Sequence, residues 1–242
     1  MRWIIVGILA AAAATDSMAG GHGYLPAHAR VMDEAAIWSA HGKRRLVLWV
    51  ADAQESREED YGDVLTCPEM AIGRHYVTGR ARLSLVDERR SRIEDSVLLE
   101  TSPEEPLLGI PVAVGRTLYD APGGAHRVMR LRDINRDGRA DEFVLYMAGS
   151  CSDFVATIAG YSKRQDKVIW YTFHLDVNDE GQLSTEDSHW IPIQFLRRAP
   201  RRGVWRFTAT YPEYPPREYR YEIRYDAAQE RFVGAETIVQ VP

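Results

Sequence analysis

The 242-residue sequence is short of several features that define common functional classes. It has no basic excess, since 30 Lys and Arg residues stand against 35 Asp and Glu residues and the formal net charge is -5. Dedicated nucleic-acid binders usually carry a clear basic excess, so we expect no nucleic-acid partner. The chain also lacks HExxH, GxSxG and SxxK motifs and a glycine-rich phosphate loop. No internal repeat of roughly 20–50 residues is evident, which argues against a propeller or a solenoid.

The composition is that of a globular protein that can bury a core, with 45% apolar and 27% charged residues.

The first residues have the proportions of a secretory signal peptide. Arg2 gives a short basic region, residues 3–14 form an apolar run, and Ser17 and Ala19 are the small residues that a signal peptidase reads. The run is short for a spanning helix, which needs about 20 apolar residues. We therefore expect cleavage after Ala19. The alternatives are cleavage after Ala14 and an uncleaved membrane anchor. The mature chain is expected to have no transmembrane segment and to be periplasmic or secreted.

The sequence has two cysteines, Cys67 and Cys151. An even pair in an exported protein is most simply a disulfide, because the compartment is oxidising. A thiol nucleophile or a metal ligand is the alternative, and the absence of a CxxC spacing argues against it.

Most of the chain beyond residue 45 has the pattern of β-strands. Residues 46–50 form an apolar run, and three hairpins are expected, at 80–86 with 93–99, 154–161 with 167–175, and 217–225 with 231–241. In the last hairpin Tyr219, Tyr221, Ile223 and Tyr225 alternate with charged residues, which favours a core-packed face over a sugar-binding platform. Residues 28–41 have apolar residues at helical spacing and predict a short N-terminal helix. The sequence thus predicts a mainly β fold, with antiparallel sheets in a sandwich or barrel-like arrangement.

A proline- and glycine-rich stretch near residues 101–126 is the best candidate for a long connection or a domain boundary. The cysteine pair spans it. We therefore expect residues 20–242 to form a single β-rich domain, with residues 1–19 as the signal peptide.

One segment has a spacing that carries chemistry. Residues 133–141 place side-chain oxygens at positions 1, 3, 5 and 9 of a loop (Asp133, Asn135, Asp137 and Asp141), with glycine at position 6. Calcium takes six to eight oxygen ligands, and a glycine lets a tight loop wrap the ion. Position 7, Arg139, is expected to contribute its backbone carbonyl, and Glu142 is a possible further ligand. The alternative is a polar turn in which the Asp and Asn side chains bind nearby backbone amides.

This loop resembles the DxNxDGxxD calcium loops that join two strands in FG-GAP and VCBS-type repeats, and the first part of the dockerin loop. The resemblance covers about 15 residues and implies calcium as the ligand, without implying a propeller fold. An EF-hand is disfavoured because position 12 is Val144 rather than Glu. The cysteine segments and the loop together also resemble a family of uncharacterised secreted bacterial proteins, which implies export but no particular activity.

These observations predict an exported calcium-binding protein with a non-catalytic structural or ligand-binding role at the cell envelope, whose ligand or partner is unknown. The alternative is an exported hydrolase that acts on an envelope polymer through carboxylates such as Glu142, Asp153 or Glu218. Two weaker features favour solvated loops. They are the stretch 176–187, which keeps a degraded calcium spacing, and the arginine cluster at 197–202.

Overall fold

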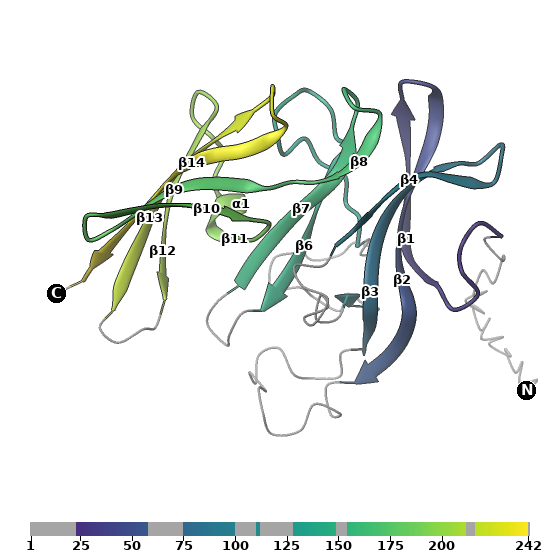
Figure 1. Cartoon of the computed structure of the whole chain (residues 1–242), viewed down its shortest axis with the longest axis horizontal. Helices are drawn as coiled ribbons and strands as arrows, with labels where there is room; N and C mark the ends of the chain where they lie inside the picture. The colour runs from purple at the N-terminus through teal and green to yellow at the C-terminus, as the bar shows by residue number, and fades with distance from the viewer. Residues whose placement is uncertain are drawn as a thin grey trace, which may run out of the picture.

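The computed structural model describes residues 23–57, 75–99, 110–111, 128–148, 154–211 and 216–241. Strands dominate these residues and form three sheets, which Figure 1 shows side by side. The N-terminal sheet contains β1 (Arg30–Ser39), β2 (Gly42–Arg57), β3 (His75–Asp87), β4 (Arg92–Leu98) and β5 (Ile110–Pro111). The central sheet contains β6 (Glu142–Ala148), β7 (Phe154–Ser162), β8 (Lys167–Trp170) and β11 (Ile191–Pro192). The C-terminal sheet contains β9 (Phe173–Asp179), β10 (Gln182–Ser188), β12 (Val204–Tyr211), β13 (Arg217–Asp226) and β14 (Arg231–Gln240). The prediction of a mainly β fold is confirmed.

The central sheet is buried on both faces. Successive side chains of a strand point to opposite faces, and β6 uses this alternation to serve two cores. Phe143 and Leu145 join a core with the N-terminal sheet, whereas Val144 between them joins a second core with the C-terminal sheet. On β7 the same division separates Ala159 from Ile158. The order of layers is therefore N-terminal sheet, central sheet, C-terminal sheet (Figure 1).

The second core is rich in aromatic rings. Phe173 stacks on Phe232 with 4.9 Å between ring centroids, and Phe195 stacks on Trp205 at 5.0 Å. The tyrosine stripe of β13 belongs to this core, because Tyr221 is buried and its neighbours on the same face pack against it. Core packing, as predicted for this stripe, is confirmed.

The hairpin expected at 154–161 and 167–175 is only partly correct. The chain pairs β7 with β8 but leaves the central sheet after Trp170, and β9 begins in the C-terminal sheet at Phe173. There β9 pairs in parallel with β14, the one parallel pair among the described strands. The short segment between β8 and β9 is thus the crossing point between two layers. It brings Tyr171, which is 1% exposed, into the second core.

The N-terminal helix expected at 28–41 is wrong in its position. These residues form β1, in which Ala35 and Ile37 are buried while Trp38 is 70% exposed. The period is two rather than 3.6, and the turn into β2 at Gly42, with φ of 103°, completes a hairpin. The short helix of the described chain is α1 (Gln194–Arg197) instead.

Several sequence expectations fall outside the described residues. They concern the signal segment 1–19, Cys67 and Cys151, and all of the 101–126 connection except residues 110 and 111. Within the part of the chain that the structure describes, no helix is long and apolar enough to cross a membrane.

Candidate functional site

The predicted calcium loop lies immediately before β6 and is closed at its base. The N–H of Arg132 donates to the carbonyl of Glu142 at 2.6 Å, and the N–H of Glu142 donates back at 3.1 Å. Between these ends the chain bends through two positive φ angles, 67° at Arg136 and 90° at Gly138. Glycine adopts such a φ without steric cost, so the sequence places it where the loop turns most sharply.

Three of the predicted ligands hold the loop through local hydrogen bonds. Asp133 Oδ2 accepts from the N–H of Gly138 at 3.2 Å, and Asn135 Oδ1 accepts from the N–H of Asp137 at 2.9 Å. Asp137 Oδ1 in turn accepts from the N–H of Arg139 at 2.9 Å. The last two bonds each run from a side chain to the N–H two residues on, as in Asx turns, so they fit both a calcium loop and a polar turn.

Asp133 has a feature that the local hydrogen bonds do not explain. Its second carboxylate oxygen, Oδ1, is buried and has no hydrogen-bond partner within the described residues. A buried, unpaired carboxylate oxygen is unfavourable, and native proteins normally satisfy such atoms with a donor, water or an ion. A polar turn that only binds its own amides leaves this oxygen without a partner, as Asp179 Oδ1 also is in the hairpin at 176–187, whereas a cation in the loop would satisfy it.

Asp141, at position 9, is paired with the loop's own arginine. The Nε atom of Arg139 lies 2.6 Å from Asp141 Oδ2, and Arg139 Nη2 donates to the carbonyl of Trp38 at 2.9 Å. Burial raises the pKa of Asp141 above its ordinary value, and Arg139 opposes that rise. Arg139 therefore ties the loop to the β1–β2 hairpin and neutralises the carboxylate that the calcium spacing assigns to position 9.

Glu142 is turned into the protein and is completely buried. Its Oε2 accepts from the N–H of Ile134 at 2.9 Å, and its Oε1 accepts from Asn135 Nδ2 at 3.0 Å and from the Tyr171 hydroxyl at 3.3 Å. Burial, together with the nearby charge of Asp137 and despite the donated amides, raises the pKa of Glu142 to about 8. Because all these contacts lie inside the protein, the geometry suits Glu142 to orienting Asn135 more than to binding an ion directly.

The structure thus brings the predicted residues into one loop but divides their roles. Asp133, Asn135 and Asp137 line the bend, Asp141 faces Arg139, and Glu142 faces the core. No group of three or more His, Cys, Asp or Glu side chains is arranged to hold a metal ion among residues 23–57, 75–99, 110–111, 128–148, 154–211 and 216–241. Sequence reasoning missed Tyr171 and the carbonyl of Trp38, because both are far from the loop in the sequence and belong to no motif of their own.

The second, weaker stretch at 176–187 is a β-hairpin. Asp176 pairs with Thr185 across β9 and β10, and a two-residue turn at Glu180 and Gly181 joins the strands. The positive φ angles of 51° and 91° are those of a tight hairpin turn. Asp176 and Asn178 share one face of β9, but Ser184 pairs with Val177 between them and therefore lies on the opposite face, so these oxygens do not surround a common point.

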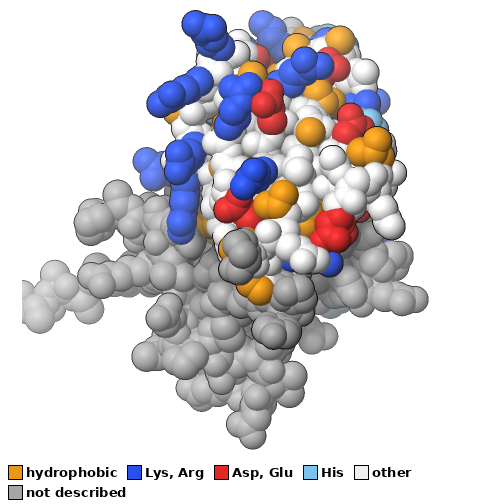
Figure 2. Space-filling model, turned by 90° about the vertical axis from the view of Figure 1, so that its left-hand side faces the viewer, with side chains coloured by type: hydrophobic (Ala, Val, Ile, Leu, Met, Phe, Trp, Pro, Cys, Tyr) orange, Lys and Arg blue, Asp and Glu red, His pale blue; other side chains and the backbone are white. Residues whose placement is uncertain are grey.

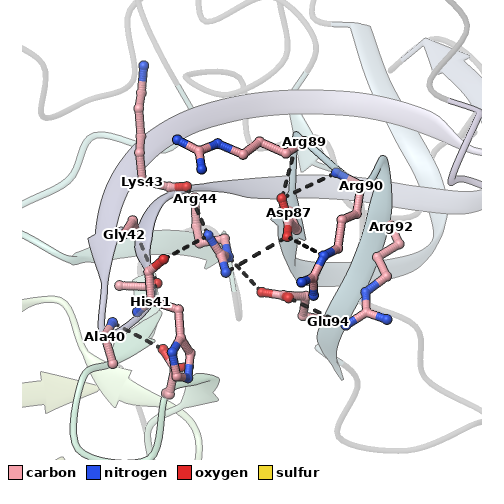
Figure 3. Close-up of polar contacts among 12 residues, drawn as sticks. Ala40, His41, Gly42, Lys43, Arg44, Asp87, Arg89, Arg90, Arg92 and Glu94 are labelled. Carbon is pink, nitrogen blue, oxygen red and sulfur yellow. Dashed lines mark hydrogen bonds and ion pairs between the residues drawn. The ribbon is translucent and has the colours of Figure 1, made fainter.

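A separate group of charged residues joins the β1–β2 and β3–β4 hairpins (Figure 3). Arg44 lies at its centre, with Nε 2.7 Å from Glu94 Oε2 and Nη2 3.8 Å from Asp87 Oδ2. Burial of Asp87 raises its pKa, but the amides of Arg89 and Arg90 and the charge of Arg44 outweigh this effect and leave the pKa lowered. Every carboxylate here has a cationic partner, which is typical of a structural network.

Of the carboxylates considered for a hydrolase, the two that the structure describes do not face each other. Glu142, the first residue of β6, is buried on the face of the central sheet that packs against the C-terminal sheet, next to Tyr171. Glu218 is on the outer face of β13, opposite the core-facing tyrosines, and pairs with Arg220 at 2.6 Å. Asp153 lies outside the described residues.

Comparison with known proteins adds no relative from which a role can be transferred. No protein-family model, no curated protein and no solved structure matches this chain. A role can therefore be proposed only from the loop and its contacts.

Proposed function

We propose that this is an exported calcium-binding protein in which the ion ties the loop at residues 133–141 to the start of β6 and serves a structural, non-catalytic role. The observation that carries the proposal is the buried, unpartnered Oδ1 of Asp133, in a loop whose spacing matches a calcium loop.

The ion would be held by the side chains of Asp133, Asn135, Asp137 and Asp141 and by the backbone carbonyl of Arg139. Calcium would supply positive charge that neutralises carboxylates packed close together. For Asp141 to bind, its carboxylate must leave the guanidinium of Arg139, which lies 2.6 Å away. The arginine thus acts as an internal competitor that holds the loop together when calcium is absent.

Glu142 is proposed as a positioning residue. It accepts a hydrogen bond from Asn135 Nδ2 at 3.0 Å. The amide oxygen of Asn135 therefore points toward the bend of the loop, where it accepts from the N–H of Asp137 at 2.9 Å. Which atom of an Asn amide is oxygen is assigned from its partners, here a carboxyl oxygen of Glu142 on one side and the N–H of Asp137 on the other.

The location fits a site of modest affinity. Calcium modules outside the cell work at dissociation constants of about 10⁻⁴ to 10⁻³ M. A periplasmic or secreted protein, as the N-terminal sequence predicts, meets calcium in that range. We propose that the folded, calcium-loaded domain binds a ligand or partner at the cell envelope.

Equilibrium dialysis of the full chain against calcium tests the proposal. We expect one calcium per chain, its loss in Asp133→Asn, and no change in Asp176→Asn, which makes the same substitution in the hairpin at 176–187. No binding at several times 10⁻³ M calcium, or a loss in Asp176→Asn in place of Asp133→Asn, would overturn the assignment.

A further inference from the structure

Three arginines project from the short connection between α1 and β12. Arg198, Arg201 and Arg202 are all exposed. The backbone that carries them is fixed, because the N–H of Arg201 donates to Val204 at 2.9 Å and the N–H of Val204 donates back at 3.1 Å. Arg202 and Gly203 form the turn, with φ angles of 53° and 77°. Asn, Asp and Gly suit such a turn best, so the arginine at 202 is not explained by backbone preference.

Arg224 extends this group onto the sheet. It is exposed on β13 and pairs with Val204 of β12, at the same end of the sheet as the turn. We call Arg198, Arg201, Arg202 and Arg224 the arginine patch. On the face that Figure 2 shows, Lys and Arg side chains gather toward the top and along one side.

The patch differs from the other arginines of β12 and β13 in having no counter-charge among the described residues. Arg206 is paired with Glu222 at 2.8 Å, and Arg220 with Glu218 at 2.6 Å. Among the described residues, no ion pair or side-chain hydrogen bond neutralises any member of the patch. Asp226, two residues after Arg224, uses its Oδ1 to accept from the amides of Ala228 and Gln229.

We propose that the arginine patch docks the protein on a bilayer that contains acidic phospholipids. Guanidinium groups present a planar fork of donors that matches phosphate oxygens, and exposed arginines near an anionic leaflet are attracted to its surface potential. This inference is independent of the calcium loop, which belongs to a different sheet.

The distribution of charge favours a membrane over an acidic polymer. The chain as a whole carries a net charge of -5, so a flexible polyanion that wraps it meets repulsion away from the patch. A bilayer is a plane that touches one end of the molecule. At physiological salt the Debye length is about 8 Å, so acidic residues farther than this from the bilayer are largely screened and repel it little.

Co-sedimentation of the full chain with vesicles tests the docking. We compare phosphatidylcholine vesicles with vesicles that contain about one-third phosphatidylglycerol, and we expect binding to the second kind that weakens as salt is raised. The neutral vesicles report any contribution of the apolar residues 3–14. The triple variant Arg198→Gln/Arg201→Gln/Arg202→Gln should lower the partition coefficient about a hundredfold, since each arginine near the surface contributes about fivefold.

The matched control removes three paired or remote arginines, as Arg206→Gln/Arg220→Gln/Arg92→Gln, and so changes the net charge equally. We expect it to bind acidic vesicles within a few-fold of the unmodified chain. Equal losses in both triple variants, equal binding to neutral vesicles, or binding to polyphosphate without binding to acidic vesicles would each overturn the proposal.

Discussion

Glu142 and Gly160 are paired at the beginning of the β6–β7 ladder, and the backbones there lie closer than a side chain would permit. A Cβ atom on Gly160 would overlap the carbonyl oxygen of Asp141 and would lie 2.9 Å from Cα of Glu142. The same carbonyl accepts from the N–H of Tyr161 at 3.1 Å. The end of the candidate loop is thus seated directly on the central sheet.

Gly160→Ala is expected to destabilise the protein, because the contacting atoms belong to the backbone and cannot rotate away. Overpacking of this kind costs roughly 1–3 kcal/mol. Urea denaturation measures the loss. Gly23→Ala is the control, since nothing lies within 4 Å of a Cβ at that position. Equal stability of the two variants would show that the loop is not seated as described.

The stability of the calcium-free protein should decrease as pH rises, because Glu142 binds its proton more tightly when folded. Its pKa is raised from 4.5 to about 8, so the folded state holds one more proton than the unfolded state between these values. The free energy of unfolding therefore falls across this window, by at most about 5 kcal/mol.

Glu142→Gln keeps the shape of the side chain and cannot ionise. We measure the free energy of unfolding of both proteins in chelator from pH 4.5 to 8. Relative to the unmodified chain, Glu142→Gln should become more stable as the pH rises. Glu222→Gln, at an exposed ion pair, should show no such trend, because the pKa of Glu222 is lowered by its bond to Arg206. A constant difference for Glu142→Gln would contradict the raised pKa.

Arg139→Gln is expected to increase calcium affinity several-fold. The substitution frees Asp141 from the guanidinium 2.6 Å away, so calcium no longer has to displace it. Arg136→Gln removes one positive charge from the same loop, and no ion pair involves that residue within the described chain. Calorimetric titration of both variants with calcium separates two effects, the release of Asp141 from Arg139 and the loss of one positive charge from the loop. Equal calcium affinities in the two variants would mean that Asp141 is not a ligand.

Local patterns predicted the strands whose partners are close in sequence. The β13–β14 hairpin follows from the alternation around Tyr221 and Ile223, because period two with polar residues between suffices to place one face inside. Residues 28–41 were misjudged because Val31, Ala35 and Trp38 also have helical spacing. Pairing with β2 decided the conformation, and it leaves Trp38 exposed.

Contacts between distant elements were beyond sequence reasoning. The parallel pairing of Phe173 with Phe232 joins strands far apart in the chain, and no local pattern encodes it. Within the site, the spacing of Asp133, Asn135 and Asp137 predicted one shared bend. The contact of Glu142 with the Tyr171 hydroxyl was not predicted, because Tyr171 comes from the crossing point between β8 and β9.

The most direct test of the calcium proposal is the melting temperature of the full chain in millimolar calcium and then in excess chelator. At millimolar calcium, an ion that binds only the folded state with a dissociation constant of about 10⁻⁴ to 10⁻³ M adds roughly 0.4–1.4 kcal/mol of stability. For a chain of this length that corresponds to roughly 2–4 °C per kcal/mol. We predict a higher melting temperature in calcium, and no calcium-dependent change in Asp137→Ala. The same melting temperature with calcium and with chelator in the unmodified chain would contradict the proposal and reduce the loop to a polar turn.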